Sequence, residues 1–210
     1  MTDAPKRALL MIDVQREYVD GALPIAHPPL QESLPNIVAA VEAAHAADVP
    51  VVLVRHVDAA DSPVFAAGSR GAELHDTVAT AAHDLLLVKE AVSCFAGTHL
   101  AAWLEAHGVD TVTIAGFMTQ HCDESTARDA ADLGLGVELL ADATGTLPLT
   151  TPSGTISARD LHERTLLVLA SGFASVTSTE AWIAAASTGA PLEAPNLWAS
   201  TEPARAARSA

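Results

Sequence analysis

The sequence has few cysteines, few aromatic residues and few cations. Its 210 residues include two cysteines, Cys94 and Cys122, 4% aromatic residues, and 11 Lys and Arg against 26 Asp and Glu, for a net charge of −15. Two cysteines without a CxxC spacing exclude a disulfide framework and a cysteine zinc site. The shortage of cations argues against a nucleic-acid binder or a protein that docks on anionic membranes, so we expect neither kind of partner.

Long hydrophobic runs are also absent. No stretch approaches the ~18 consecutive apolar residues of a membrane span, and the apolar run that begins at Ala8 is too short for a signal sequence. Hydrophobic residues nevertheless make up 50% of the chain and charged residues 18%, which excludes an intrinsically disordered protein. We therefore expect a globular, cytoplasmic protein.

Short apolar runs alternate with alanine-rich amphipathic segments along the chain. The apolar runs cover 8–12, 49–54, 85–88, 111–115, 135–140 and 174–177, and the helical segments cover 34–47, 100–104, 124–133 and 158–170. Such nearly continuous β-branched and leucine runs are typical of strands buried on both faces of a parallel sheet. The alternation predicts a doubly wound α/β fold in one domain, 1–190, followed by an arm or disordered tail, 191–210. Residues 58–82 fit the alternation poorly and read as a long functional connection.

Polar residues follow the apolar runs, at the edge where a parallel sheet binds ligands. They are Asp13, the pair Arg55 and His56, Lys89, the segment 116–122 and Asp142. An acid, a base and a thiol at the ends of different strands predict an active site there.

Cys122 has the surroundings of a nucleophile, because it precedes a predicted helix and can meet Lys89. A helix N-terminus and a neighbouring ammonium both lower the pKa of a thiol, and Asp13 can carry the proton of the reaction. Backbone N–H groups before Cys122 can receive an oxyanion. Two structural alternatives stay open: Cys122 as a small buried apolar residue, and Asp13 with Lys89 as a structural ion pair.

Several segments resemble the signatures of the isochorismatase-like cysteine hydrolase family. They are 10–15 (LMIDVQ), 89–98 (KEAVSCFAGT), 116–122 (GFMTQHC) and 125–130 (STARDA), with Arg55-His56 and Asp142 in the expected order. The likeness extends over about 7–183, and the order and spacing of the segments together make it specific.

The resemblance implies a three-layer α/β/α sandwich around a six-stranded parallel sheet and an Asp13–Lys89–Cys122 triad. Members of the family hydrolyse C–N bonds of small amide, carbamoyl or ureido compounds through a thioester, without a cofactor. It further implies a cis peptide bond between Phe117 and Met118, an oxyanion hole formed by the N–H groups of Met118 and Cys122, and a homodimer or higher homo-oligomer.

Three features depart from the family pattern. Asp123 stands where a small apolar residue is usual, and it can either raise the pKa of Cys122 or contact a cationic substrate. His56, Asp58, Asp61 and His75 lack the metal-binding spacing of nicotinamidases, so we expect no metal. Isochorismatases proper lack the cysteine and cleave a vinyl ether, a substrate against which Cys122 argues.

The substrate-binding candidates surround these motifs. They are Gln15, Tyr18, His56, Phe95, Phe117 and His121. For the aromatic residues generic packing is the alternative, and for His121 it is packing of the helix. We therefore expect a hydrolase of a small amide, with two rivals: a non-amide hydrolase such as a vinyl-ether hydrolase, and a ligand-binding protein without turnover.

Overall fold

The computed structural model describes residues 4–194 and 196–208, so the remaining parts of the predicted domain (1–3) and arm (195, 209–210) lie outside it. Strands form at the predicted apolar runs. They are β1 (Arg7–Ile12), β2 (Val51–His56), β3 (Leu85–Lys89), β4 (Thr111–Phe117), β5 (Gly136–Gly145) and β8 (Ser175–Thr177), with a separate hairpin of β6 (Leu149–Thr151) and β7 (Gly154–Ile156). The six main strands pair in parallel in the order β3-β2-β1-β4-β5-β8, which confirms the predicted sheet.

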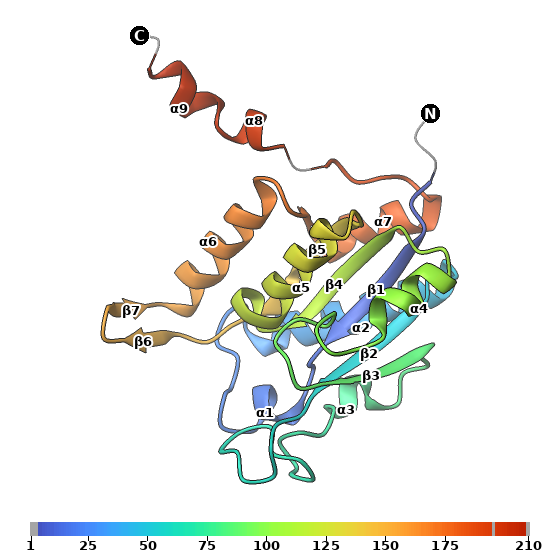
Figure 1. Cartoon of the computed structure of the whole chain (residues 1–210), viewed down its shortest axis with the longest axis vertical. Helices are drawn as coiled ribbons and strands as arrows, with labels where there is room; N and C mark the ends of the chain where they lie inside the picture. Colours follow the sequence, from blue (N-terminus) through green and yellow to red (C-terminus); the bar gives the residue numbers. More distant parts are fainter. Residues whose placement is uncertain (1–3, 195, 209–210) are drawn as a thin grey trace.

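Helices connect the strands in the order expected for a doubly wound sheet. They are α1 (Arg16–Val19), α2 (Leu30–Ala46), α3 (Asp76–Ala79), α4 (Leu100–Ala106), the π-helix η1 (Thr119–Asp123), α5 (Glu124–Asp132), α6 (Ala158–Ala170), α7 (Thr179–Thr188), α8 (Leu197–Ser200) and α9 (Glu202–Ala206). Figure 1 shows α4, α5 and α6 on one face of the sheet and α2 with α7 on the other. The three-layer α/β/α sandwich is therefore confirmed. None of these helices, within the described residues, has both the length and the apolar character that a bilayer crossing requires.

The alternating side chains of β1 divide the core into two layers. Leu10 and Ile12 join one buried cluster with residues of α4, α5 and α6, whereas Leu9 and Met11 join the other with residues of α2 and α7. Because successive residues of a strand face opposite sides, a continuous apolar run is what a strand covered on both faces requires.

Strand β3 departs from this pattern because it lies at the edge of the sheet. Leu86 and Val88 are 47% and 48% exposed, while Leu87 and Lys89 between and after them are buried. The prediction that all six strands are covered on both faces was therefore wrong for β3.

The chain order of the strands reverses beside β1. From β1 the chain proceeds to β2 and β3 on one side, and then crosses to β4, β5 and β8 on the other. Ligands of open α/β sheets bind at the carboxyl ends of strands at such a point. Asp13 follows β1 and the segment Met118–Cys122 follows β4, so both lie at this point.

Candidate active site

Asp13, Lys89 and Cys122 meet at the carboxyl ends of three different strands. Lys89 ends the edge strand β3, and its side chain extends past the end of β2 to the residue that follows β1. Its Nζ lies 2.8 Å from Oδ2 of Asp13 and donates a hydrogen bond to Sγ of Cys122 at 3.2 Å. It also donates to the Ala91 carbonyl at 3.2 Å. The structure thus brings the three expected residues into one contact group.

The thiol is the member of this group that reaches solvent. Cys122 is 7% exposed, whereas Asp13 and Lys89 are 0% and 2% exposed. Asp13 takes a left-handed backbone conformation (φ 51°), and its N–H donates to the carbonyl of Val54 in β2 at 3.1 Å. Because Asp13 and Lys89 are more deeply buried than Cys122, Cys122 is the member of the group that an entering ligand meets.

Burial and mutual charge set the protonation of the triad. Burial raises the pKa of Asp13 above its ordinary value, although Lys89 and a hydrogen bond from Cys122 oppose that shift. Burial alone lowers the pKa of Lys89, but the charges of Asp13, Cys122 and Cys94 outweigh it and the net pKa is raised. Lys89 is therefore an ammonium at physiological pH.

The pKa of Cys122 moves opposite to our expectation. Burial, then the Asp13 carboxylate, raise the pKa of the thiol, and the attraction of Lys89 only reduces this rise. Cys122 precedes α5, as the sequence predicted, and lies within the π-helix η1. At rest Cys122 is therefore a thiol.

His56 and Asp58 extend the charged group on the side of β2. His56 Nδ1 lies 3.4 Å from Lys89 Nζ, and His56 Nε2 lies 3.2 Å from Oδ1 of Asp58. Because an ammonium only donates, the network assigns Nδ1 as the acceptor and Nε2–H as the donor to Asp58. His56 thereby positions Lys89, and its expected substrate contact stays a prediction.

Gln15 has a structural role, and its expected substrate contact stays a prediction. Its Nε2 donates to the carbonyls of His56 and Ala72 at 2.8 and 2.9 Å, and its Oε1 accepts from the His56 N–H at 2.8 Å. Both amide protons are therefore used by the backbone, and Gln15 fixes the end of β2 against the long connection.

Three aromatic rings form a wall beside the triad. The Tyr18 ring packs against Phe65 and Phe117 at centroid distances of 5.0 and 5.9 Å, and the His56 ring packs against Phe65 at 5.4 Å. Burial, followed by the charges of Cys122, Asp13 and Asp123, raises the pKa of Tyr18 well above its usual value. Its hydroxyl is therefore a neutral group near the nucleophile.

Sequence reasoning missed Phe65, which lies in the long connection 58–82. It is 5% exposed and takes a left-handed conformation (φ 52°). Its position as an aromatic residue in a connection already marked as functional was the available signal. No periodicity indicates which residue of an irregular segment turns inward.

The other expected site residues are placed as follows. The Phe117–Met118 peptide bond is cis, as the resemblance implied, and Met118 is half-buried. His121 is exposed on η1 beside the nucleophile, and Phe95 lines a surface cavity of about 290 Å³ together with Asp129 and Leu133. The oxyanion role of the Met118 and Cys122 N–H groups and the substrate contacts of His121 and Phe95 stay predictions.

Of the acidic and histidine side chains near β2, His56 and Asp58 contact each other. Among the residues that the structure describes, no group of three or more His, Cys, Asp or Glu side chains is arranged to hold a metal ion. His75 instead caps α3, where its ring accepts from the Thr77 N–H.

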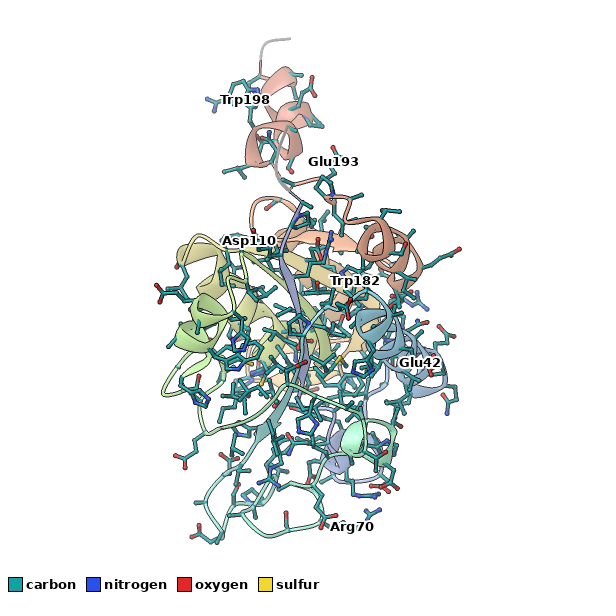
Figure 2. All side chains as sticks on the ribbon, turned by 90° about the vertical axis from the view of Figure 1, so that its right-hand side faces the viewer. Glu42, Arg70, Asp110, Trp182, Glu193 and Trp198 are labelled. Carbon is teal, nitrogen blue, oxygen red and sulfur yellow. The ribbon has the colours of Figure 1, made fainter. Side chains whose placement is uncertain are left out.

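A cavity of about 410 Å³ lies away from the triad. Its lining includes Thr111 and Gly136, which begin β4 and β5, and Pro191 and Leu192. Figure 2 places Asp110, next to this edge, toward the α8 end of the molecule and Arg70 at the opposite end. This cavity is therefore at the amino ends of the strands, where none of the triad residues lies.

Comparison with known proteins agrees with the fold. The family model described as the isochorismatase domain matches residues 7–181. A crystal structure of a candidate isochorismatase from Burkholderia xenovorans LB400 superposes with a TM-score of 0.94 at 50% identity, covering 99% of this chain and 100% of that one.

Two curated relatives differ in their stated activities. A secreted isochorismatase effector of Verticillium dahliae is 34% identical over 137 residues, 65% of this chain and 71% of that protein. Nicotinamidase 3 of Arabidopsis thaliana is 31% identical over 180 residues, 80% of this chain and 82% of that protein.

Proposed function

The chain belongs to the isochorismatase domain family and is a hydrolase, and from this premise we propose that it cleaves the C–N bond of a small amide, carbamoyl or ureido compound through a thioester on Cys122. The observation that carries the proposal is the contact of one ammonium, Lys89 Nζ, with both the carboxylate of Asp13 and the thiol of Cys122. Relatives that act on amides support the C–N bond as the target.

The first step couples attack to proton transfer. The Cys122 sulfur attacks the substrate carbonyl carbon while its proton passes to the Asp13 carboxylate, which accepts a hydrogen bond from the thiol. Lys89 remains an ammonium throughout and stabilises the negative charge that develops on sulfur. Backbone N–H groups of Met118 and Cys122 hold the oxyanion.

The later steps return the enzyme to its starting state. Asp13 gives the proton to the departing nitrogen as the C–N bond breaks, which leaves a thioester and an amine or ammonia. Asp13 then removes a proton from water, the resulting oxygen attacks the thioester, and the proton passes back to the sulfur as acid is released. The raised pKa of Asp13 suits it to accept and donate a proton in turn.

Substitution of the two cysteines tests this function. Ammonia release from a panel of small amides and ureas is expected to fall by at least about 10³-fold in Cys122→Ala. Cys94→Ala is the matched control, because Cys94 is fully buried and influences Lys89 only electrostatically. Intact-mass spectrometry of quenched wild-type enzyme is expected to show an acyl adduct on Cys122. Full activity of Cys122→Ala refutes the proposal.

A vinyl-ether hydrolase is the second candidate, and the similarity to the Verticillium dahliae isochorismatase favours it. This reaction needs no acyl-enzyme. Turnover of isochorismate that survives in Cys122→Ala, with no ammonia release from any amide, supports this candidate over the first.

A further inference from the structure

Asp123 is a buried acid that nothing in the mechanism uses. It follows the nucleophile directly in η1 and is fully buried, with an exposed fraction of 0%. No group in the described part of the chain forms a hydrogen bond with either of its carboxyl oxygens. A buried polar group without a partner costs about 1–3 kcal/mol, so such a group requires an explanation.

Two other buried acids each have a cation beside them: Asp13 has Lys89 at 2.8 Å, and Glu138 has Arg7 at 2.8 Å. Glu138, 4% exposed, accepts hydrogen bonds from Arg7, Thr113 and Trp182 at 2.8 to 3.1 Å. Asp123 differs from both, because no cation and no hydrogen-bond donor of the described residues contacts its oxygens. The open oxygens of Asp123 mark it as a group whose partner comes from outside the chain.

The surroundings of Asp123 place its carboxyl at the triad. It directly follows Cys122 in η1, and its carboxyl group is near enough to Asp13 and Lys89 for their charges to shift its pKa. Lys89 contacts Asp13, Cys122, His56 and the Ala91 carbonyl, and it forms no hydrogen bond with Asp123. A ligand bound at the adjacent Cys122 would supply the partner that Asp123 lacks.

Burial without a hydrogen-bond donor or a paired cation favours the neutral form of Asp123. Burial, followed by the negative charge of Asp13, raises its pKa well above the ordinary value, and Lys89 offsets only part of that rise. A neutral carboxyl group has one O–H donor and one carbonyl acceptor side by side. This pair is complementary to the C=O and N–H of an amide or ureido group, with which it can form two parallel hydrogen bonds.

We propose that Asp123 is a specificity-determining residue that binds, as a neutral acid, a second H–N–C=O group of the substrate next to the bond that is cleaved. The substrate class is then small uncharged diamides and acylureas, in preference to simple amides or amides with an ammonium group. This inference rests on the proposed thioester hydrolysis, which supplies the position of the reacting carbonyl beside Cys122.

Binding to the inactive Cys122→Ala protein tests the inference without turnover. Malonamide and N-acetylurea serve as diamide and acylurea probes, acetamide as the simple amide and glycinamide as the cationic amide, with dissociation constants measured by calorimetry. In this background Asp123→Ala is expected to weaken malonamide binding at least tenfold and acetamide binding less than threefold. Asp123→Asn, which keeps one donor and one acceptor, is expected to restore malonamide binding to within threefold of the parent.

A neighbouring acid provides the matched control. Glu124→Gln removes the next carboxylate along the helix, which forms an ion pair with Arg128 at 2.7 Å, and is expected to leave all four constants unchanged. Tighter binding of glycinamide than of malonamide, lost in Asp123→Asn, shows an ionised Asp123 and overturns the inference. So does the absence of malonamide and N-acetylurea binding, or equal binding by Asp123→Ala.

Infrared spectroscopy gives a readout that needs no ligand. The difference spectrum of wild type minus Asp123→Asn at pH 7 is expected to contain the C=O stretch of a protonated carboxyl group. A carboxylate band in its place contradicts the neutral acid. Turnover separates the two proposals: Asp123-dependent binding in Cys122→Ala protein without any hydrolysis by wild type refutes the proposed function, whereas hydrolysis that is indifferent to Asp123 refutes only this inference.

Discussion

Asp13 has two opposing effects on Cys122. In the proposed mechanism its carboxylate accepts the proton of the thiol, and its negative charge also raises the pKa of that thiol. Lys89 is attracted to both groups, with its Nζ at 2.8 Å from Asp13 and 3.2 Å from Cys122. Removal of the Asp13 charge therefore separates the reactivity of the thiol from catalysis.

In the Asp13→Asn variant, Cys122 is expected to be alkylated faster than in wild type. The variant is expected to turn over substrate more slowly. Without the carboxylate, Lys89 lowers the pKa of Cys122. Each unit by which this pKa falls raises the thiolate fraction about tenfold. Loss of the general base is expected to reduce kcat by about 10²–10⁴. Iodoacetamide labelling at pH 7.5 followed by peptide mass spectrometry measures the first effect, and ammonia release measures the second.

Cys94 is the internal control in the same labelling experiment. Burial, with the charge of Asp13, raises its pKa to about 12, so it is expected to label slowly in both proteins. Slower labelling of Cys122 in Asp13→Asn than in wild type contradicts the charge assignment of the triad.

At the scale of single residues the sequence predicted which three residues of the candidate triad meet, but not their protonation. Asp13, Lys89 and Cys122 could be found because each follows a strand or precedes a helix, and parallel strands end at one edge of the sheet. The direction of the Cys122 pKa shift could not be found, because it depends on burial, which only the packed structure defines. The scaffold role of Gln15 likewise depends on two carbonyls, those of His56 and Ala72, that are distant in sequence.

Strands β1 and β4 approach closely next to the site, at Gly116. This glycine has φ 127°, and a Cβ atom there would lie 1.9 Å from the carbonyl oxygen of Ile12. Only glycine accepts this conformation and this contact without displacement of the backbone. The positions of Asp13 and Phe117, which follow Ile12 and Gly116, depend on the same approach.

Gly116→Ala is expected to destabilise the protein by about 3 kcal/mol or more and to reduce activity in the fraction that remains folded. Urea unfolding measures the first effect and ammonia release the second. Gly172→Ala is the matched control, because the nearest atom to its added Cβ is a side-chain carbon 4.0 Å away. Equal stability of Gly116→Ala and wild type contradicts the strand contact.

Helix α6 is linked to η1 through a buried histidine. His162, 3% exposed, contacts Thr119 Oγ1 through Nδ1 at 2.9 Å, and its ring packs against His27 at 5.4 Å. Burial, followed by the charge of His27, lowers its pKa to about 4, although a backbone hydrogen bond at Ala141 and the charge of Glu163 oppose this. His162 therefore stays neutral in the folded protein at pH values where an unfolded histidine is charged.

This depressed pKa predicts a loss of stability in mild acid. Between an unfolded pKa of ~6.5 and the folded value, the unfolded chain binds the additional proton, so stability falls as the pH falls. The free energy of unfolding is expected to drop by about 2 kcal/mol more in wild type than in His162→Gln between pH 7 and pH 5. Urea unfolding at both pH values measures it, with the exposed His83→Gln as control. Equal drops in wild type and His162→Gln contradict the assignment.

Among the elements, segments with a clear apolar periodicity and a glycine at their end were easier to predict than segments without these signals. The helices α5 and α6 lie almost at their predicted bounds, since their apolar periodicity and flanking Gly134 and Gly172 were readable. The β6–β7 hairpin and α7 were missed. The hairpin has strands of three residues, too short for any periodicity, and α7 is mostly alanine and threonine around Trp182.

Exposed apolar side chains lie on α8, near the C-terminal end of the chain, and on α6. Figure 1 shows α8 and α9 projecting from the body beyond the amino ends of the strands. On α8, Leu197 and Trp198 are 63% and 71% exposed, and on the body the α6 side chains Leu167 and Val168 are 73% and 48% exposed. Hydrogen bonds from Arg7 to the Ala190 carbonyl and from Ser175 to the Glu193 carbonyl fix the chain just before α8.

These surfaces support the expected homo-oligomer, in which we propose that the α8–α9 arm packs on a second copy of the chain. Full burial of each large apolar side chain contributes roughly 1.5–3 kcal/mol, so Leu197 and Trp198 are substantial anchors. Truncation after Ala194 leaves the Ser175 contact intact and is expected to convert an oligomer into a monomer, measured by multi-angle light scattering at micromolar concentration. Trp198→Ser is expected to weaken assembly in the same direction, while the exposed variant Glu202→Gln keeps it. A monomeric full-length chain, or an oligomer that survives truncation, contradicts the role of the arm. Because the triad lies at the opposite edge of the sheet, amide hydrolysis is expected to persist in the truncated chain.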